Sequence, residues 1–158
     1  MTEPTPEAVA GMINENRDGW GVTNGLHFLR ASRDEVACEL EVGAHHLQAY
    51  GIVHGGVHAG VIETLASIGA ALDAMPRGQS VVGLENHTSF VRAVRSGKLS
   101  ARATPLTRGR RSQLWEGTVT DEAGRLVATG RVRLLCLEPQ SEIAGETVTV
   151  KPGAPGQR

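Results

Sequence analysis

A single carboxylate stands near the middle of a long apolar segment. Residues 51–75 read GIVHGGVHAGVIETLASIGAALDAM, in which small and aliphatic side chains surround Glu63 on every helical face. Removing an unpaired carboxylate from water costs free energy, so burial raises its pKa or requires a partner. Ser67, four residues later, shares a helical face with Glu63, and its hydroxyl could hold a water there. We predict a shielded, reactive Glu63, in preference to one that points to solvent from a free helix edge, and an Asp73 that reaches water.

A second candidate is the sequence His54-Gly55-Gly56, placed where a loop enters this helix. The first turn of a helix leaves backbone N–H groups unpaired with a partial positive charge, and glycines let a ligand approach them closely. Such donors polarise a carbonyl whose carbon is attacked. A tight turn is the other interpretation of two glycines before a helix. The carboxylate nine residues after His54 favours the oxyanion site.

Other catalytic chemistries are less consistent with the sequence. A metalloprotease helix places its Glu directly after the first His, whereas Gly55 and Gly56 follow His54 and should interrupt a regular helix before His58. A G-x-S-x-G nucleophile turn is absent from the sequence. We therefore expect neither a metal nor a cofactor. The two cysteines, Cys38 and Cys136, are expected to be reduced core residues.

Chain length and charge balance indicate which domain organisation and which classes of binding partner to expect. The chain has 158 residues, enough for one domain with its own core, and 16 Lys and Arg balance 17 Asp and Glu. A net charge of -1 does not indicate binding to nucleic acid or to an anionic membrane. The glycines and Glu63 favour a core helix over a membrane span in residues 51–75. With no secretory signal pattern at the N-terminus, we expect a cytoplasmic protein.

Hydrophobic periodicity gives the order of elements. Residues 25–42 alternate apolar and polar side chains around Arg33 and Asp34, which predicts a hairpin. A long helix follows over residues 57–75, and a short helix is predicted earlier, beginning at Pro6. Extended segments separated by turn signals complete the chain as a meander, at residues 80–94, 98–107, 111–121 and 125–138.

This order predicts an α+β fold, an antiparallel sheet wrapped around one long central helix. Because that helix is apolar on almost every side, its free side is expected to meet another subunit. We divide the chain into an N-terminal extension (1–20), the main domain (21–138) and a flexible tail (139–158) that is rich in Gly and Pro.

Four motifs together resemble the hotdog-fold acyl-CoA thioesterases, in particular the PaaI-like and 4-hydroxybenzoyl-CoA thioesterase subgroup with a Glu on the helix. They are GIVHGG at 51–56, Glu63 itself, NHTSFVRAV at 86–94 and DEAGRLVA at 121–128. The resemblance covers residues 20–137. It implies a hotdog fold and a homotetramer, a dimer of dimers with each active site at a dimer interface.

The resemblance also implies roles for individual residues. Glu63 is expected to act as nucleophile or as general base for water. Gly55 donates its backbone N–H to the thioester carbonyl, Gln48 orients the thioester, and His54 shapes the loop. Ser67 stands where the family often has a Thr that holds the hydrolytic water, so it keeps the hydroxyl and lacks the methyl group.

Basic residues could bind the CoA phosphates, because arginine forks match phosphate oxygens. The resemblance places this end of the substrate at a turn comprising Gly109, Arg110, Arg111 and Ser112. Arg92 matches a family arginine that is either a phosphate contact or a structural ion pair.

The expected activity is hydrolysis of an acyl-CoA to free acid and CoA. Hydroxybenzoyl, phenylacetyl or dihydroxynaphthoyl-like groups fit the resemblance, and so do medium-chain acyl groups. A hotdog enoyl-CoA hydratase is one alternative, although such enzymes pair an Asp with a His that this chain lacks. A non-catalytic acyl-CoA-binding hotdog protein is the other.

Overall fold

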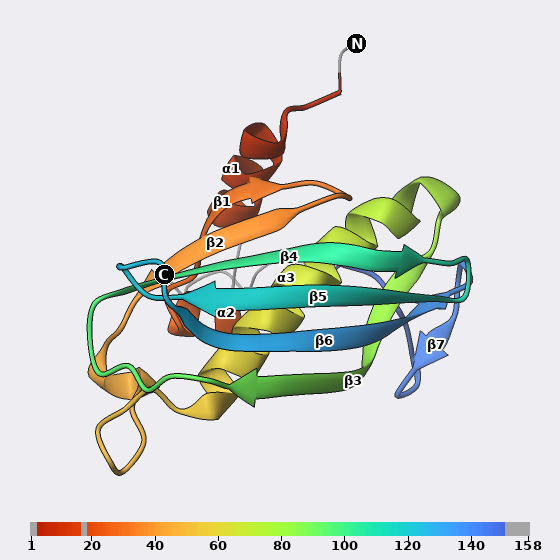
Figure 1. The fold of residues 1–158 in the computed structure, drawn as a ribbon. Coiled ribbons are helices and arrows are strands. Elements are labelled where there is room, and N and C mark those ends of the chain that lie inside the picture. The colour runs from red at the N-terminus through yellow and green to blue at the C-terminus, as the bar shows by residue number, and fades with distance from the viewer. Residues whose placement is uncertain (1–2, 17–18, 151–158) are drawn as a thin grey trace.

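One long helix, α3 (Gly55–Ala74), lies across a six-stranded antiparallel sheet (Figure 1). The computed structural model describes residues 3–16 and 19–150. The strands are β1 (His27–Ala31), β2 (Val36–Glu41), β3 (Ser80–Phe90), β4 (Lys98–Arg108), β5 (Ser112–Thr120) and β6 (Leu126–Leu137). The expected hairpin, long helix and later extended segments are therefore confirmed.

The order of strands across the sheet is β1-β2-β4-β5-β6-β3. The expected meander is wrong for β3, which pairs with β6 at the far edge and leaves β4 to pair with β2. The cause is α3, because the helix crosses the sheet after β2 and delivers the chain to the opposite edge. Residues 91–97 then cross back to β4.

The core lies between α3 and the inner face of the sheet. Alternate residues of β5 are buried, as expected of a strand with one face against a core. Among them, Trp115 is fully buried over Gly69, where a Cβ atom would lie 2.2 Å from the indole Cη2. Glycine is therefore required for the sheet and the helix to approach so closely. The apolar side chains that α3 buries are Val57, Val61, Ile62, Leu65, Ala66, Ala70 and Ala74.

Asp73 is buried, so the expectation that it reaches water is wrong. Its carboxylate accepts hydrogen bonds from Arg77 Nη2 at 3.1 Å and Gln113 Nε2 at 3.2 Å. It also pairs with Arg33 Nη2 at 3.1 Å, from the turn between β1 and β2. The loop between β1 and β2 and the strand β5 cover the C-terminal turn of α3. The ion pairs and hydrogen bonds of Asp73 offset the cost of burying its carboxylate.

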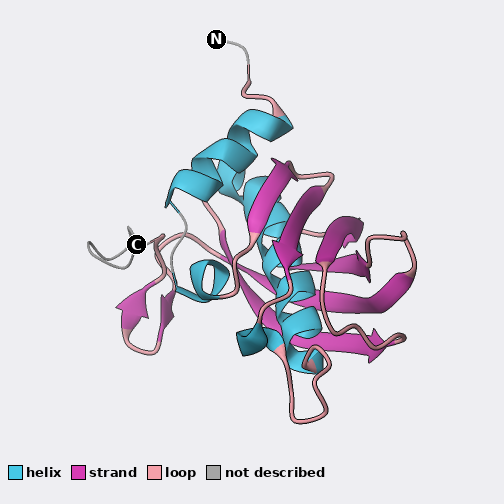
Figure 2. Cartoon of the chain, turned by 90° about the vertical axis from the view of Figure 1, so that its left-hand side faces the viewer, coloured by secondary structure: helices cyan, strands magenta, loops and turns pink. Residues whose placement is uncertain are grey.

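Two short helices precede the sheet, α1 (Pro6–Asn16) and α2 (Gly19–Thr23), so the predicted helix at Pro6 is confirmed (Figure 2). Asn14 on α1 exchanges two hydrogen bonds with the Phe28 backbone on β1, at 2.8 and 2.9 Å. At the other end, β7 (Glu142–Ile143) and β8 (Glu146–Thr147) form a hairpin within the expected tail. The remaining tail residues, 151–158, lie outside the described residues, and the domain boundaries stay predictions.

The cysteines and the long helix occupy core positions. Cys38 and Cys136 are free and buried, as expected, and burial raises the pKa of the Cys38 thiol to about 12. Residues Gly55–Arg77 are long and apolar enough to cross a membrane by composition alone. In the fold, however, the inner face of α3 is buried against the sheet, which is the position of a core helix.

Candidate active site

Glu63 lies on the flank of α3 that faces the edge strand β3. Its Oε2 accepts a hydrogen bond from Asn86 Nδ2 at 3.3 Å, and the same amide donates to the Ala59 carbonyl at 2.9 Å. The Glu63 side chain is exposed, so the expected shielding is not found within one chain. The reason is that the sheet covers only one face of α3 and Glu63 lies at the border of that face, beside the edge strand β3.

Two hollows meet at Glu63. The larger, of about 440 Å³, runs along α3 on the side of α2, and Ser67 shares it with Glu63 as the four-residue spacing predicts. Its lining residues are Trp20, Gly60, Glu63, Thr64, Ser67 and Ile68. A smaller hollow of about 170 Å³ separates Glu63 from β3 and is lined by Gly83, Leu84, Glu85 and Asn86.

The expected oxyanion site is at the N-terminus of α3. His54 is the N-cap, and its Nδ1 accepts a hydrogen bond from Gly56 N–H at 2.8 Å. The prediction that the glycines interrupt the helix is wrong, because α3 begins at Gly55. As the first helical residue, Gly55 has no intrahelical acceptor for its N–H. A Cβ atom on Gly55 would lie 2.6 Å from the Phe90 ring, so a larger residue here would displace that exposed ring.

The loop that carries Gln48 leads directly into His54. Gln48 Oε1 accepts a hydrogen bond from Tyr50 N–H, and Gln48 N–H donates to the Ile52 carbonyl at 2.9 Å. Arg95 fixes the tip of this loop by donating to the carbonyls of Tyr50 and Gly51, at 2.7 and 3.1 Å. Gln48, His54 and Gly55 therefore belong to one locally ordered segment.

The two halves of the predicted site are separated within one chain. Gly55 and Glu63 are eight residues apart on α3, which corresponds to about 12 Å along a helix that rises 1.5 Å per residue. A single thioester carbonyl therefore cannot contact both groups of the same chain. The structure brings Glu63 together with Ser67, and separately groups Gln48 with His54 and Gly55.

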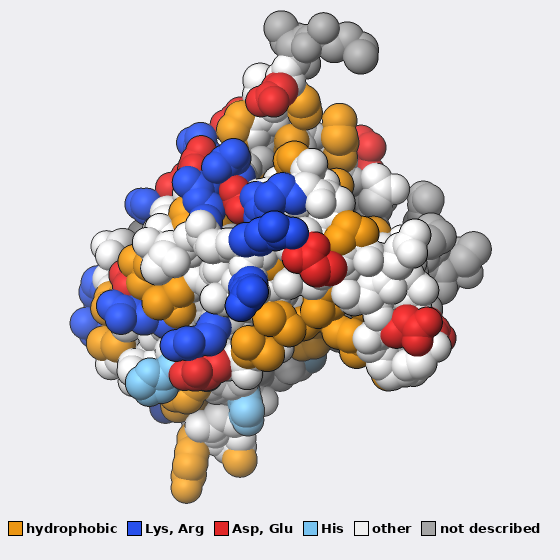
Figure 3. All heavy atoms as spheres, turned by 90° about the vertical axis from the view of Figure 1, so that its right-hand side faces the viewer, with side chains coloured by type: hydrophobic (Ala, Val, Ile, Leu, Met, Phe, Trp, Pro, Cys, Tyr) orange, Lys and Arg blue, Asp and Glu red, His pale blue; other side chains and the backbone are white. Residues whose placement is uncertain are grey.

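The predicted CoA contacts do not form one cluster in the chain. Arg92 follows the end of β3, where its N–H donates to Val127 O at 3.1 Å. The turn at residues 109–112 lies at the opposite end of the sheet, where the Arg110 carbonyl accepts from Gln79 Nε2 at 3.1 Å and its guanidinium pairs with Glu138 at 3.4 Å. Figure 3 views the molecule from this side, where Lys and Arg side chains gather.

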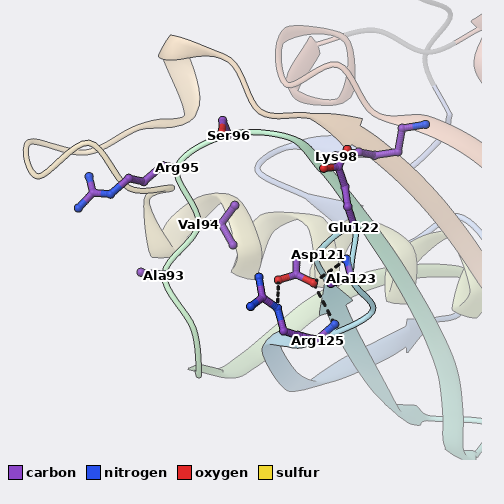
Figure 4. A pocket seen from close by; sticks show the side chains of 9 residues that line it. All are labelled: Ala93, Val94, Arg95, Ser96, Lys98, Asp121, Glu122, Ala123 and Arg125. Carbon is purple, nitrogen blue, oxygen red and sulfur yellow. Dashed lines mark hydrogen bonds and ion pairs between the residues drawn. The ribbon is translucent and has the colours of Figure 1, made fainter.

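A third hollow, of about 310 Å³, lies beneath the crossover from β3 to β4 (Figure 4). Asp121 at its edge accepts hydrogen bonds from the backbone N–H groups of Arg125 and Ala123 and from Arg125 Nε, at 2.8 to 3.0 Å. These bonds, with that from the Arg125 backbone the largest cause, lower the pKa of Asp121. The DEAG motif is therefore a turn closed by its own polar contacts. Among residues 3–16 and 19–150, no group of three or more His, Cys, Asp and Glu side chains could hold a metal ion.

Neither Trp20 nor a structural role for His46 was predicted from the sequence. His46 is buried, and its Nδ1 accepts from Gly43 N–H at 2.9 Å, so the neutral ring carries its proton on Nε2. Nε2 then donates to the Asn24 carbonyl at 3.0 Å. Burial lowers the pKa of His46 from 6.5, and it does the same for His58.

We expect acid to destabilise the protein through these histidines. Because their pKa values are lower in the folded chain than in the unfolded chain, the unfolded chain binds protons first as the pH falls. The free energy of unfolding should therefore be highest above pH 6.5 and decrease below it. His46→Gln should lower this free energy at pH 8 by about 1–2 kcal/mol, because Gly43 N–H loses its acceptor.

Urea unfolding at pH 8 and pH 5.5 tests this expectation. His46→Gln should show a smaller loss of stability between the two pH values than the parent chain, with the remaining loss due in part to His58. His27→Gln, on an exposed position of β1, is the matched control and should keep the parent's pH dependence. An unchanged pH dependence in His46→Gln would contradict the role assigned to the buried ring.

Comparisons with known proteins identify the family of the chain. A family model described as "Thioesterase superfamily" matches residues 50–128. A Mycobacterium tuberculosis protein named "Putative esterase" is 47% identical over 72% of this chain and 83% of its own length. A solved structure with the same description, also from M. tuberculosis, has a TM-score of 0.75 at 43% identity and covers 77% of this chain and 98% of the other.

Two further relatives carry thioesterase names. The proofreading thioesterase EntH of Klebsiella pneumoniae is 39% identical over 68% of this chain and 78% of its own. A thioesterase structure from Haemophilus influenzae has a TM-score of 0.75 at 28% identity, covering 87% and 93% of the two chains. The resemblance drawn from the four motifs is thereby confirmed. The chain belongs to the thioesterase superfamily, as a thioester hydrolase with the hotdog fold.

Proposed function

We propose that the protein hydrolyses an aromatic or medium-chain acyl-CoA to the free acid and CoA, with Glu63 as the reacting carboxylate. The observation that supports this most directly is the shared hollow of Glu63 and Ser67 beside apolar side chains. An acyl group can occupy the apolar part while the carboxylate meets the carbonyl carbon. The relative named as a proofreading thioesterase supports a thioester substrate in general.

The proposed active site needs two copies of the chain. Glu63 lies about 12 Å along α3 from Gly55, so we assign the oxyanion donor to the neighbouring copy. The strand β3 pairs only with β6 within the described sheet, and Leu84 and Phe90 on it are more than half exposed. Such an edge offers unpaired backbone groups and apolar surface to a second chain. This is consistent with a homotetramer built from dimers.

In the proposed reaction, the thioester carbonyl accepts a hydrogen bond from Gly55 N–H at the start of α3. The helix terminus favours the negative charge that develops on the oxygen. Glu63 either attacks the carbonyl carbon or removes a proton from a water that attacks it. The carbon–sulfur bond breaks, and CoA leaves as the thiolate and takes a proton. If Glu63 is the nucleophile, water then hydrolyses the acyl–Glu63 anhydride and restores the carboxylate. In both routes water supplies the oxygen of the free acid.

The remaining site residues are assigned positioning roles. Ser67 holds the water beside Glu63, Gln48 orients the thioester, and His54 fixes the first turn of α3 through its bond to Gly56. For the CoA phosphates we retain Arg92 and the turn of Gly109, Arg110, Arg111 and Ser112. Because Arg92 and this turn lie at opposite ends of the sheet, they would contact one CoA from different copies of the chain.

No metal or cofactor enters this proposal, since every reacting group comes from the chain or from water. We also propose a cytoplasmic location. The two buried free cysteines suit a reducing compartment, because disulfides are rare there.

Thiol release from a panel of acyl-CoA esters tests the proposed function. The panel should include hydroxybenzoyl-, phenylacetyl-, hexanoyl- and octanoyl-CoA, and an enoyl-CoA whose hydration is followed separately. Release of CoA at kcat values of about 1 per second or more on at least one ester is expected. Hydration of the enoyl-CoA without thiol release would indicate a hydratase, and tight binding without turnover would indicate an acyl-CoA-binding protein.

A further inference from the structure

The indole of Trp20 lies directly against the helix that carries Glu63. A Cβ atom on Gly60 would be 2.5 Å from Cζ2 of Trp20 and 2.6 Å from Cη2. The ring can therefore occupy its position only because residue 60 has no side chain. Trp20 is 44% exposed, so part of the ring remains available to a ligand.

The backbone of Trp20 is fixed by a buried polar chain. Both the N–H and the side-chain amide of Asn24 donate to the Trp20 carbonyl, at 3.0 and 2.9 Å. Asn24 is buried, and its own carbonyl accepts from His46 Nε2 at 3.0 Å. The backbone that carries the indole is thus ordered before any substrate arrives, which lowers the cost of ordering this segment on binding.

The hollow beside the indole is mostly apolar. Trp20 and Ile68 contribute apolar surface, and the Thr64 hydroxyl donates a hydrogen bond to the Gly60 carbonyl at 2.8 Å. The other polar side chains of the lining are those of Glu63 and Ser67. Unlike Thr64, neither donates to a backbone carbonyl of α3 in the described structure, so both can contact a ligand. The flat wall and the reacting carboxylate therefore belong to the same hollow.

We propose that Trp20 is a specificity-determining residue, whose indole forms one wall of the acyl pocket and favours planar acyl groups over flexible ones. This inference rests on the proposed thioesterase function and goes beyond it by naming the wall that discriminates between acyl groups. Stacked or edge-on aromatic pairs are more favourable than equal apolar contact, whereas an alkyl chain gains only the apolar contact. Trp20 does not take part in the bond-breaking steps.

The kinetic test compares benzoyl-CoA with hexanoyl-CoA. Trp20→Leu should lower kcat/KM for benzoyl-CoA about tenfold and for hexanoyl-CoA less than about threefold. Trp20→Phe, which keeps an aromatic ring, should preserve the parent's preference within about threefold. Equal losses on both substrates in Trp20→Leu, or no loss on either, would overturn the inference.

A second test displaces the indole of Trp20 without replacing the residue, and it has its own control variant. Gly60→Ala places a methyl group where the indole lies, so it should reduce the benzoyl preference as Trp20→Leu does. Gly11→Ala, on α1, is the matched control because a Cβ there meets nothing within 4 Å. A Gly60→Ala variant that is folded and keeps the full benzoyl preference would contradict the inference.

Binding gives a readout that does not require turnover. The chain has two tryptophans, and Trp115 is fully buried, so the difference between the parent and Trp20→Phe reports on Trp20. Phenacyl-CoA, a ketone analogue that cannot be hydrolysed as a thioester, should quench the parent and not Trp20→Phe, whereas hexyl-CoA should quench neither. Hydrolysis of acyl-CoA without this selective quenching overturns the role of Trp20 alone. Selective quenching without hydrolysis of any ester overturns the proposed function and leaves the planar pocket standing.

Discussion

Glu63→Gln is expected to lower kcat for thioester hydrolysis by about a thousandfold or more. The amide has nearly the shape of the carboxylate and can still accept the bond from Asn86, but it can neither attack a carbonyl carbon nor take a proton from water. Thiol release measured with the best ester of the panel gives the ratio. Because the side chain is exposed, the free energy of unfolding should change by less than about 0.5 kcal/mol.

The matched control is Glu85→Gln. Glu85 lines the smaller hollow beside Glu63 but pairs at 3.8 Å with Arg133, on the face of the sheet. Its replacement should leave kcat within about twofold of the parent value, since surface ion pairs of this kind contribute little. If Glu63→Gln kept parent activity, or Glu85→Gln lost it, the reacting carboxylate would have been assigned to the wrong residue.

The largest stability effect is expected from Gly69→Ala. The added methyl group would lie 2.2 Å from Trp115, whose ring is fully buried. Its Nε1 is also tied to Gln113 Oε1 at 2.9 Å, so a displaced ring loses a hydrogen bond. We expect the free energy of unfolding to fall by about 3 kcal/mol, measured by urea denaturation.

Gly11→Ala serves again as the control, because the substitution is the same and α1 leaves room for the methyl group. Alanine is the better helix former by up to about 1 kcal/mol, so this variant should be as stable as the parent or more so. A Gly69→Ala protein as stable as Gly11→Ala would show that the contact between α3 and β5 is looser than the structure indicates.

Local patterns in the sequence were sufficient to predict the elements. Strands such as β5 alternate buried and exposed residues, and the glycines and Glu63 within α3 favoured a core helix over a membrane span. The same local geometry predicted that Ser67 accompanies Glu63, because four residues is close to one helical turn.

Pairing between distant segments could not be read from such patterns. The turn signal after it marks β3 as an extended segment but does not show that its partner is β6 rather than β4. The burial of Asp73 could not be predicted because two of its three partners, Arg33 and Gln113, are about forty residues away on either side, and only Arg77 is close in sequence. Trp20 was missed for a related reason, since only the folded chain brings it onto Gly60.

The grouping of the CoA contacts failed for a geometric reason. Arg92 and residues 109–112 are close in sequence, but the eleven residues of β4 lie between them. An extended strand of that length spans about 36 Å at 3.3 Å per residue, so it carries the two basic regions to opposite ends of the sheet. Short separation in sequence is a poor guide to proximity when a strand intervenes.

The place of β3 in the sheet also constrains the order in which the protein can fold. During synthesis β3 emerges 36 residues before its partner begins, because β6 starts at Leu126. Until β6 is available, β3 has no strand to pair with in the described sheet, and α3 lacks part of its cover. Pairing between segments so far apart in sequence slows folding. The sheet is therefore expected to be completed only after the last strand has left the ribosome. A chain that ends before β6 would leave both β3 and the outer side of β5 open to association with other chains.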